Sequence, residues 1–441
     1  MRRAALFAVA AVVSLWAASA EAKGPGTPSP VTSVNGLTGT NFSFTAKADR
    51  ITTGDGNSLL FWGYAAGGGR AQYPGPTLIV NQGATVSITL TNQLTVPVSI
   101  VFPGQEGVTA TGGSPGLVTR EALPGGPAVV YTFVAGNPGT FLYGSGTTPE
   151  IQNEMGLFGA IIVRPTGFSA TNAANRRAYN HADSQYDREY LFLLSEMDPR
   201  IHLLVEHNGL NALTATDFLS DYFPNYWFIN GRTAPDTMAA AGSPLYPTQP
   251  YNIVPRMHPG ERLLMRVIGG GRDLHPFHHH GNHARIIARD GRLLRSSPAA
   301  GADLAYDVFT IQSVPGSTFD AIWEWTGKGL GWDIYGSTPH TCTPDPNGFD
   351  VTTREWCADH GKPFPVLLPD QRNLTFGEFY HFSPFLGVKG SVPPGQTLLN
   401  PTAGYMHMWH SHTEKEMTNF DIFPGGMMTM VIIELLSVPI P

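Results

Sequence analysis

The chain of 441 residues is poor in charged side chains. Charged residues make up 14% of it, against a usual share of about 25%. Lys and Arg together number 27 and Asp and Glu 34, so the formal net charge is −7. A basic patch that binds nucleic acid is therefore not expected, and neither is attraction to an anionic membrane surface.

Long apolar runs are also absent, apart from one near the N-terminus. Arg2 and Arg3 precede an apolar run from Ala4 to Ala18, and Ala20-Glu21-Ala22 follows it. Because a spanning helix needs roughly 20 apolar residues, this pattern favours a cleaved secretory signal over residues 1–22 and no membrane span. We expect the chain to be exported, to the periplasm or the cell exterior.

Cysteine is scarce, and the two that are present lie close together. Cys342 and Cys357 belong to a stretch rich in Pro, Thr, Asp and Gly. In an oxidising compartment such a pair favours a disulfide that closes a loop. His340 precedes the first cysteine and His360 follows the second, which leaves open an alternative in which this stretch holds zinc.

Glycine and proline are abundant, with 50 Gly and 37 Pro. From Asn41 to Val163 they separate short runs of period-two alternation, such as Thr85–Leu90. This pattern is typical of an all-β sandwich. From these patterns we predict a first domain at 30–165, a linker at 166–187 and a second domain at 188–441. Some helix is expected near residues 209–223.

The two halves of the chain resemble each other. Val101-Phe-Pro-Gly104 aligns with His278-His-His-Gly281, and the segment around Ser145 aligns with the segment around Ser411. The sequence therefore predicts an internal duplication. Because the second domain has about 89 extra residues between its two segments, it also predicts a long loop insertion within about residues 284–404.

Histidines gather at two places in the second domain. The run H-P-F-H-H-H begins at His275, and His410-Ser-His412 ends a strand-like run. Because alternate residues of a strand share a face, His278 with His280 and His410 with His412 can direct four imidazoles into one space. Imidazole binds copper, zinc, iron and nickel, and copper binds most tightly among the common divalent ions. The pattern predicts a metal site.

Neighbouring residues are candidates to support these ligands. Glu416, Ser411 and His283 stand beside the two motifs, and a carboxylate there would supply an oxygen ligand or accept a hydrogen bond from an imidazole N–H. For Glu414 we favour an exposed turn. His279 and His283 are expected to face solvent or to support the ligands.

Four motifs resemble those of the multicopper oxidase family of paired cupredoxin domains. They are Pro74-Gly-Pro-Thr-Leu78, Tyr226-Trp-Phe-Ile-Asn-Gly231, the H-P-x-H-x-H-G run from His275, and the H-x-H motif at His410 with Gly-Gly-Met-Met after it. The resemblance implies two Greek-key β-sandwiches, copper as cofactor and oxidoreductase activity. It implies one ligand of a blue type 1 copper, His275, and ligands of a type 2 and type 3 copper cluster at His278, His280, His410 and His412.

The chain departs from the family pattern at several of these positions. Ser411 stands where the family has the thiolate ligand of the blue site, and a hydroxyl cannot replace a soft, deprotonated sulfur. Glu416 stands where the family has a histidine. In the first domain Val101-Phe-Pro103 and Gly144-Ser-Gly146 replace two H-x-H motifs. These losses predict one or two copper ions in place of four, and no blue centre.

Two classes of function follow, and a third is weaker. The retained histidines favour a copper-dependent oxidoreductase that acts on an unknown small molecule or metal ion. The lost ligands favour a non-catalytic cupredoxin scaffold that binds a partner or sequesters metal. The third is a hydrolase with zinc, the alternative metal, on the same histidines. By analogy with two-domain relatives, whose sites form between subunits, a homotrimer is a fair expectation.

Overall fold

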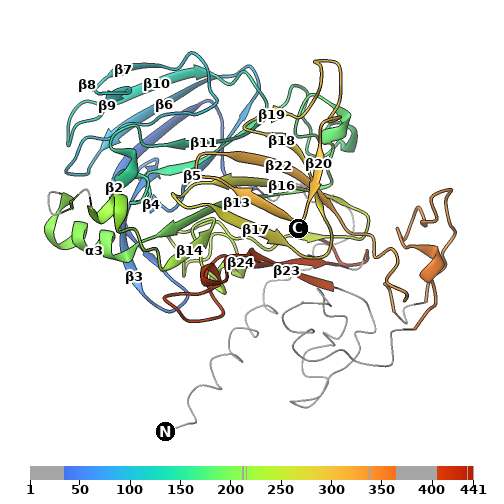
Figure 1. Ribbon diagram of the computed structural model, residues 1–441. Helices are drawn as coiled ribbons and strands as arrows, with labels where there is room; N and C mark the ends of the chain where they lie inside the picture. The colour runs from blue at the N-terminus through green and yellow to red at the C-terminus, as the bar shows by residue number, and fades with distance from the viewer. Residues whose placement is uncertain are drawn as a thin grey trace, which may run out of the picture.

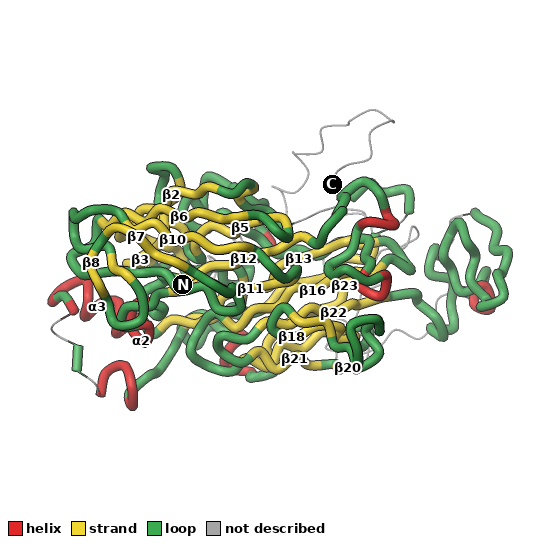
Figure 2. Tube along the Cα trace, turned by 90° about the horizontal axis from the view of Figure 1, so that it is seen from above, coloured by secondary structure: helices red, strands yellow, loops and turns green. Residues whose placement is uncertain are grey.

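Four main β-sheets form the framework of the described chain (Figures 1 and 2). The computed structural model describes residues 34–210, 213–214, 216–336, 339–363, 405–434 and 436–440. The predicted signal at 1–22 lies outside these ranges, and so does the part of the predicted insertion from 364 to 404. Within the described ranges, no helix has both the length and the apolar character that crossing a membrane requires.

The N-terminal half forms a sandwich of two sheets. In spatial order the larger sheet contains β4 (Ala71–Gln72), β3 (Ser58–Ala66), β2 (Asn41–Thr52), β6 (Thr85–Asn92), β10 (Val129–Val134) and β7 (Thr109–Gly112). The smaller sheet contains β1 (Leu37–Thr38), β5 (Gly75–Asn81), β12 (Phe158–Arg164) and β11 (Gly139–Gly144). Outside these sheets lie the hairpin β8 (Ser114–Pro115) and β9 (Arg120–Glu121), and α2 (Pro149–Gln152).

Period-two alternation builds the core of this sandwich. Along β2, Phe42, Phe44 and Ala46 are buried, whereas the residues between them are exposed or half-buried. The predicted strand at Thr85–Leu90 lies within β6, whose apolar residues face the same core. A strand with one face on the core and one toward solvent requires this pattern, so the sequence prediction is confirmed here.

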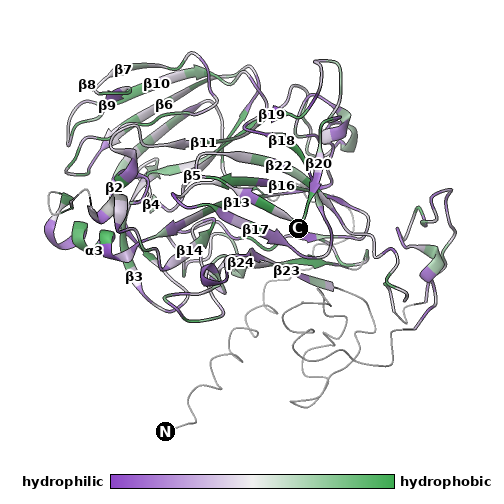
Figure 3. Cartoon of the chain, viewed as in Figure 1, coloured by the Kyte–Doolittle hydropathy of each residue, from purple (hydrophilic) through white to green (hydrophobic). Residues whose placement is uncertain are grey.

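The C-terminal half forms a second sandwich. One sheet contains β14 (Tyr226–Ile229), β13 (Arg188–Met197), β16 (Arg262–Gly269), β22 (Thr318–Glu324), β18 (Ala284–Arg289) and β19 (Arg292–Leu293), with β20 (Tyr306–Val308) paired to β18. The other contains β15 (Arg256–Met257), β24 (Met428–Ile433), β23 (Tyr405–Ser411), β17 (His275–His279) and β21 (Thr310–Ser313). Figure 3 shows β17 as a hydrophilic strand, which reflects its histidines.

Short helical segments connect the strands of this half. They are η2 (Ala173–Asn175), η3 (Ala182–Ser184), α3 (Pro199–Asn208), η5 (Thr216–Ser220), η6 (Asp236–Met238), η7 (Cys357–Asp359) and η8 (Glu414–Met417). Aromatic rings fill the core between the two sheets, where Trp409 lies 5.1 Å from Trp323 and 5.7 Å from Phe192 between ring centroids. Such contacts stabilise the two strands that carry the histidine motifs.

The predicted internal duplication is visible in the strand pairing. Val101 and Gly144 form an isolated antiparallel bridge in the first sandwich. Their counterparts His278 and His410 are paired across β17 and β23 in the second. The sequence alignment therefore matched residues that occupy equivalent places, and the first sandwich has an aliphatic residue and a glycine where the second has two imidazoles.

A buried network of charges joins the two sandwiches. Glu189 on β13 accepts hydrogen bonds from Arg164 of β12 and from Arg266 of β16. Arg266 also donates to the Thr140 hydroxyl of the first sandwich at 2.9 Å, and that hydroxyl donates to Asp320 at 2.6 Å. The five strands that carry these residues, β11, β12, β13, β16 and β22, are thereby fixed against one another, which joins the two sandwiches into one packed body.

Candidate metal centre

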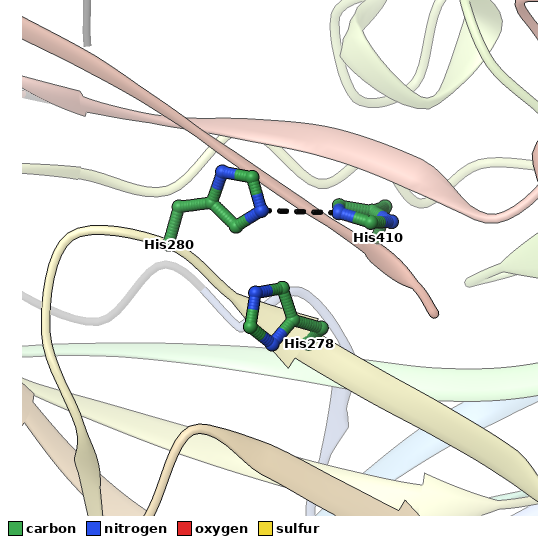
Figure 4. Close-up of side chains that lie close together, drawn as sticks. All are labelled: His278, His280 and His410. Atoms are coloured by element: carbon green, nitrogen blue, oxygen red, sulfur yellow. Dashed lines mark hydrogen bonds between the residues drawn. The ribbon is translucent and has the colours of Figure 1, made fainter. Parts of the chain in front are cut away.

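Three imidazoles converge where β17 and β23 lie side by side. One ring nitrogen from each of His278, His280 and His410 lies within 4.8 Å of the other two. Figure 4 shows the three rings close together, with His280 and His410 joined by a contact of 3.2 Å between their Nε2 atoms. The pairing of His278 with His410 in the sheet sets this spacing. Strand β17 with the residue that directly follows it, His280, and strand β23 thus supply one cluster of nitrogen donors from distant parts of the sequence.

Hydrogen bonds orient two of these rings. His410 Nδ1 lies 2.7 Å from the backbone carbonyl of Ser411, which can only accept, so the proton resides on Nδ1 and the Nε2 lone pair faces the cluster. His278 Nδ1 lies 2.9 Å from the Thr310 hydroxyl on β21. Burial lowers the pKa of His410, as does the nearby His412. A neutral imidazole with a defined tautomer is the form that binds a metal ion.

His412 stands at the solvent edge of the cluster. Its side chain is exposed, and its ring centroid lies 5.0 Å from that of His278 and 5.8 Å from that of His410. The sequence predicted four imidazoles in one space. The structure brings three of them together and places the fourth beside them, so the role of His412 as a ligand stays a prediction.

The neighbouring candidates have different surroundings. His279 is 1% exposed, its Nε2 lies 3.0 Å from the Val308 carbonyl, and burial lowers its pKa to about 4. Of the two places expected for His279, the one facing solvent was therefore wrong, because His279 shares the buried face of β17 with the core residue Phe277. His283 and Glu414 are exposed, as expected.

His275 lies away from the cluster, between two carboxylates. Its Nε2 is 2.8 Å from Glu196 Oε2 and its Nδ1 is 2.8 Å from Glu416 Oε2. His275 is fully buried, and the other two residues are 2% and 5% exposed. Both ring nitrogens are thus engaged by carboxylate oxygens, and in this arrangement neither is presented to a metal. We call these three residues the buried triad.

The buried triad holds a positive charge on His275. Burial disfavours the charged imidazole, but hydrogen bonds and charges from Glu196 and Glu416 outweigh it and raise the pKa of His275 to about 10. Burial likewise opposes the charged form of Glu196. The pKa of Glu196 is nevertheless lowered, because His275 donates a hydrogen bond and carries a positive charge, and because the backbone N–H groups of Arg272 and Asp273 also donate to the carboxylate. The site therefore carries an imidazolium between two acids.

This triad predicts a distinct pH dependence of stability. The folded-state pKa of His275 is raised, so its contribution is fully present below the unfolded value of about 6.5 and is lost as the pH rises through about 10. In the wild type, the free energy of unfolding measured with urea should fall by on the order of a few kcal/mol across this pH range. The His275→Gln variant should lack this loss at alkaline pH. If the free energy of unfolding falls equally with pH in both chains, the charged state given to His275 is wrong.

Sequence reasoning found His275 and Glu416 but missed Glu196. Glu196 belongs to β13, every residue of which is buried. A carboxylate in a wholly buried strand requires a charged or hydrogen-bonded partner, and that is the signal from which the triad could have been suspected.

The position of the family's thiolate ligand contains no sulfur. The Ser411 side chain is fully buried, and its Oγ accepts a hydrogen bond from the Thr413 N–H at 3.2 Å. The predicted disulfide between Cys342 and Cys357 is confirmed. These are the only two cysteines of the chain, so neither supplies a thiolate to this site.

Part of the chain is similar in sequence to known proteins. Residues 67–167 match the family model of the multicopper oxidases. Laccase 1 of Metarhizium acridum is 36% identical over 96 residues, which are 21% of this chain and 15% of that protein. L-ascorbate oxidase of Cucurbita pepo var. melopepo is 37% identical over 97 residues, 21% of this chain and 17% of that protein. Residues 67–167 therefore resemble a multicopper oxidase domain.

Solved structures share the fold over most of the chain. The blue copper oxidase from Nitrosomonas europaea has a TM-score of 0.54 at 18% identity and covers 90% of this chain and 86% of its own. The multicopper oxidase mgLAC has a TM-score of 0.52 at 16% identity, with 92% and 88% covered. The predicted fold of two cupredoxin-like β-sandwiches is thereby confirmed.

The sequence match and the histidine cluster lie in different domains. The matched residues 67–167 belong to the first sandwich, whereas the three imidazoles belong to the second. The chain spans less than a fifth of the curated laccase and ascorbate oxidase that it matches. The sequence similarity therefore says nothing about the individual histidines, whose roles rest on the geometry.

The donors of the cluster fit copper. Three neutral imidazoles with no thiolate and no carboxylate among them form a nitrogen-only set, and imidazole nitrogen binds copper more tightly than the other common divalent ions. The family model that residues 67–167 match is that of the multicopper oxidases, whose name contains the same metal.

Proposed function

We propose that the chain is an exported, copper-binding oxidoreductase of multicopper oxidase type that works without a blue centre. The observation that carries this proposal is the convergence of ring nitrogens of His278 on β17, His280 directly after β17 and His410 on β23 within 4.8 Å. When copper is bound there, it supplies a Lewis acid or a one-electron redox centre. The three imidazoles are the ligands, and His412 at the solvent edge is the fourth candidate.

The residues around the cluster have definable tasks. The Ser411 carbonyl holds the His410 proton on Nδ1 and keeps Nε2 turned inward. The Thr310 hydroxyl fixes the ring of His278 from a neighbouring strand. The exposure of His412 opens the cluster toward solvent, where a small molecule or a metal ion can approach as substrate. Ligands held by such partners keep their geometry without a metal-induced rearrangement.

The absence of a blue centre rests on the chemistry at its expected position. Ser411 offers a hydroxyl in place of a thiolate, and both ring nitrogens of His275 are engaged by Glu196 and Glu416. Blue copper sites require a soft sulfur ligand with two imidazoles. The resemblance places the type 1 copper beside His275. The charged side chains of the buried triad occupy that place.

The number of copper ions follows from the first sandwich. Val101 and Gly144 hold the places equivalent to His278 and His410 and have no side-chain donor. We therefore propose one or two copper ions per chain, and a homotrimer by analogy with two-domain relatives. The disulfide supports export, since such bonds persist in oxidising compartments.

A second candidate function is a non-catalytic scaffold that binds metal or a partner. The loss of the first-sandwich ligands favours it, because a fold can persist after its site is lost. Oxidation of a phenol by the copper-loaded chain, compared with the same chain after chelation, separates the two functions. If the chain is an oxidoreductase, the copper-loaded chain should oxidise the phenol well above the rate of the chelated control. If the loaded chain retains its copper but oxidises the phenol no faster than the control, the scaffold function is favoured.

A further inference from the structure

A second cluster of metal-binding side chains lies in the loop that carries the disulfide. Residues 340–363 stand away from the four sheets in both views (Figures 1 and 2). Among the described residues, Asp333, His340, Glu355 and His360 each place a ligand atom within 4.8 Å of the others. None of the four belongs to the imidazole cluster, so this group is a separate feature of the chain.

Both imidazoles face both carboxylates. His340 Nε2 lies 2.8 Å from Glu355 Oε2 and 3.7 Å from Asp333 Oδ2. His360 Nδ1 lies 3.1 Å from Glu355 Oε1 and 3.4 Å from Asp333 Oδ2. Two nitrogens and two carboxylates thus surround one point in space. In an isolated ion pair one imidazole would lie near one carboxylate. Here each imidazole lies near both carboxylates, as is required of side chains that share one cation.

We propose that Asp333, His340, Glu355 and His360 form a divalent transition-metal site. Two imidazole nitrogens and two carboxylate oxygens suit a four-coordinate ion such as Zn²⁺. Ca²⁺ and Mg²⁺ favour shells made of oxygen alone, so the two nitrogens argue against them. This site is independent of the proposed oxidoreductase function.

The two buried carboxylates of this group, Asp333 and Glu355, favour a bound cation. The side chains of Asp333 and Glu355 are only 2% and 1% exposed. Within the described ranges, their ion pairs are with His340 and His360 alone. Two adjacent buried carboxylates are costly unless positive charge lies between them. A divalent ion supplies that charge and takes the place of two imidazole protons.

The backbone holds these ligands in place. The Asp333 carboxylate accepts hydrogen bonds of 2.8 Å from the backbone N–H groups of Tyr335 and Gly361. The disulfide between Cys342 and Cys357 ties together the two stretches that carry the other three ligands. The ligands are therefore largely positioned before a metal binds, which reduces the entropy cost of binding.

The site would fasten the loop to the second sandwich. Asp333 lies between Trp332 and Ile334, which belong to the buried core of that sandwich, and the Tyr405 hydroxyl donates to the Ile334 carbonyl at 3.0 Å. The other three ligands come from the projecting loop. His360 is 33% exposed, which gives an ion access from solvent. The metal would act as a structural clamp between core and loop.

Zinc binding by the full chain tests this proposal. The His278→Ala/His410→Ala variant serves as the background, so that the imidazole cluster takes up no zinc. After chelation we expect this background to bind one equivalent of Zn²⁺ per chain in a calorimetric titration. Adding His340→Ala and His360→Ala should abolish that equivalent, whereas adding His207→Ala, an exposed histidine on α3, should leave it intact.

A conservative variant guards against misfolding. Glu355→Gln keeps the size of the side chain and should weaken zinc binding by about tenfold or more, since the ligand loses its charge. Copper binding by His340→Ala/His360→Ala in the otherwise unaltered chain should persist and would show that the sandwich is intact. A background variant that binds no zinc, or equal zinc affinity in the Glu355→Gln and His207→Ala chains, would overturn the proposal.

Discussion

Replacing Glu189 with alanine is expected to lower the free energy of unfolding by about 3 to 5 kcal/mol. Glu189 is fully buried between Arg164 and Arg266. Burial alone would raise its pKa, but the two guanidinium groups lower it to about 2. Removal of this carboxylate leaves two guanidinium groups buried without their common anion, and that is far costlier than the loss of an exposed ion pair.

Urea unfolding near neutral pH measures this effect. Arg50→Ala is the matched control, because Arg50 is 47% exposed and pairs with Glu206 at the surface. An exposed pair contributes about 0 to 1 kcal/mol, so the control should unfold almost as the wild type does. The depressed pKa of Glu189 also means that its stabilisation is present above about pH 4.5 and is lost as the pH falls through about 2. Similar losses in the two variants would contradict the role given to the network.

The His278→Ala/His410→Ala double variant is expected to lose the bound copper. The two residues are paired across β17 and β23, and their removal leaves one imidazole of the three. A single imidazole cannot retain copper against a chelator, since affinity grows with each ligand that the protein positions. Metal analysis after reconstitution and dialysis measures the change.

His283→Ala provides the control for this experiment. His283 follows the same motif but is exposed and lies outside the cluster, with its ring 5.7 Å from that of Phe309. The control should keep the copper content of the wild type. Copper retained by the double variant, or lost equally from the control, would show that the metal is held elsewhere.

The internal repeat was the most informative feature of the sequence. It aligned Val101 with His278 and the residue before Ser145 with His410, and both pairs form equivalent bridges in the two sandwiches. The alignment succeeded because these positions are fixed by strand pairing, and strand pairing is encoded in the period-two alternation of each half.

The surroundings of His275 and His279 could not be predicted in the same way. The triad depends on Glu196, which lies 79 residues before His275 and reaches it through the packing of two sheets. His279 was expected to face solvent or to support the ligands, because alternation tells which residues share a face and not what covers that face. Tertiary packing therefore decided both cases.

The sequence predicted some helix near residues 209–223, and the short π-helix η5 at Thr216–Ser220 lies within that range. The longest described helix of the chain was not predicted. The longer helix α3 begins earlier, at Pro199, with Asp198 as its N-cap. An Asp-Pro pair is a recognised helix start, since the carboxylate accepts from the first turn and proline fits its first position, so this signal was present but overlooked.

We propose that the second sandwich holds copper on imidazoles without a thiolate. Electron paramagnetic resonance and visible absorption of the purified chain, reconstituted with Cu²⁺ and freed of excess metal, test this proposal. We expect retained copper with nitrogen hyperfine splitting and no intense thiolate-to-copper absorption band. A strong band of that kind, or a chain that retains no copper, would show that the proposal is wrong.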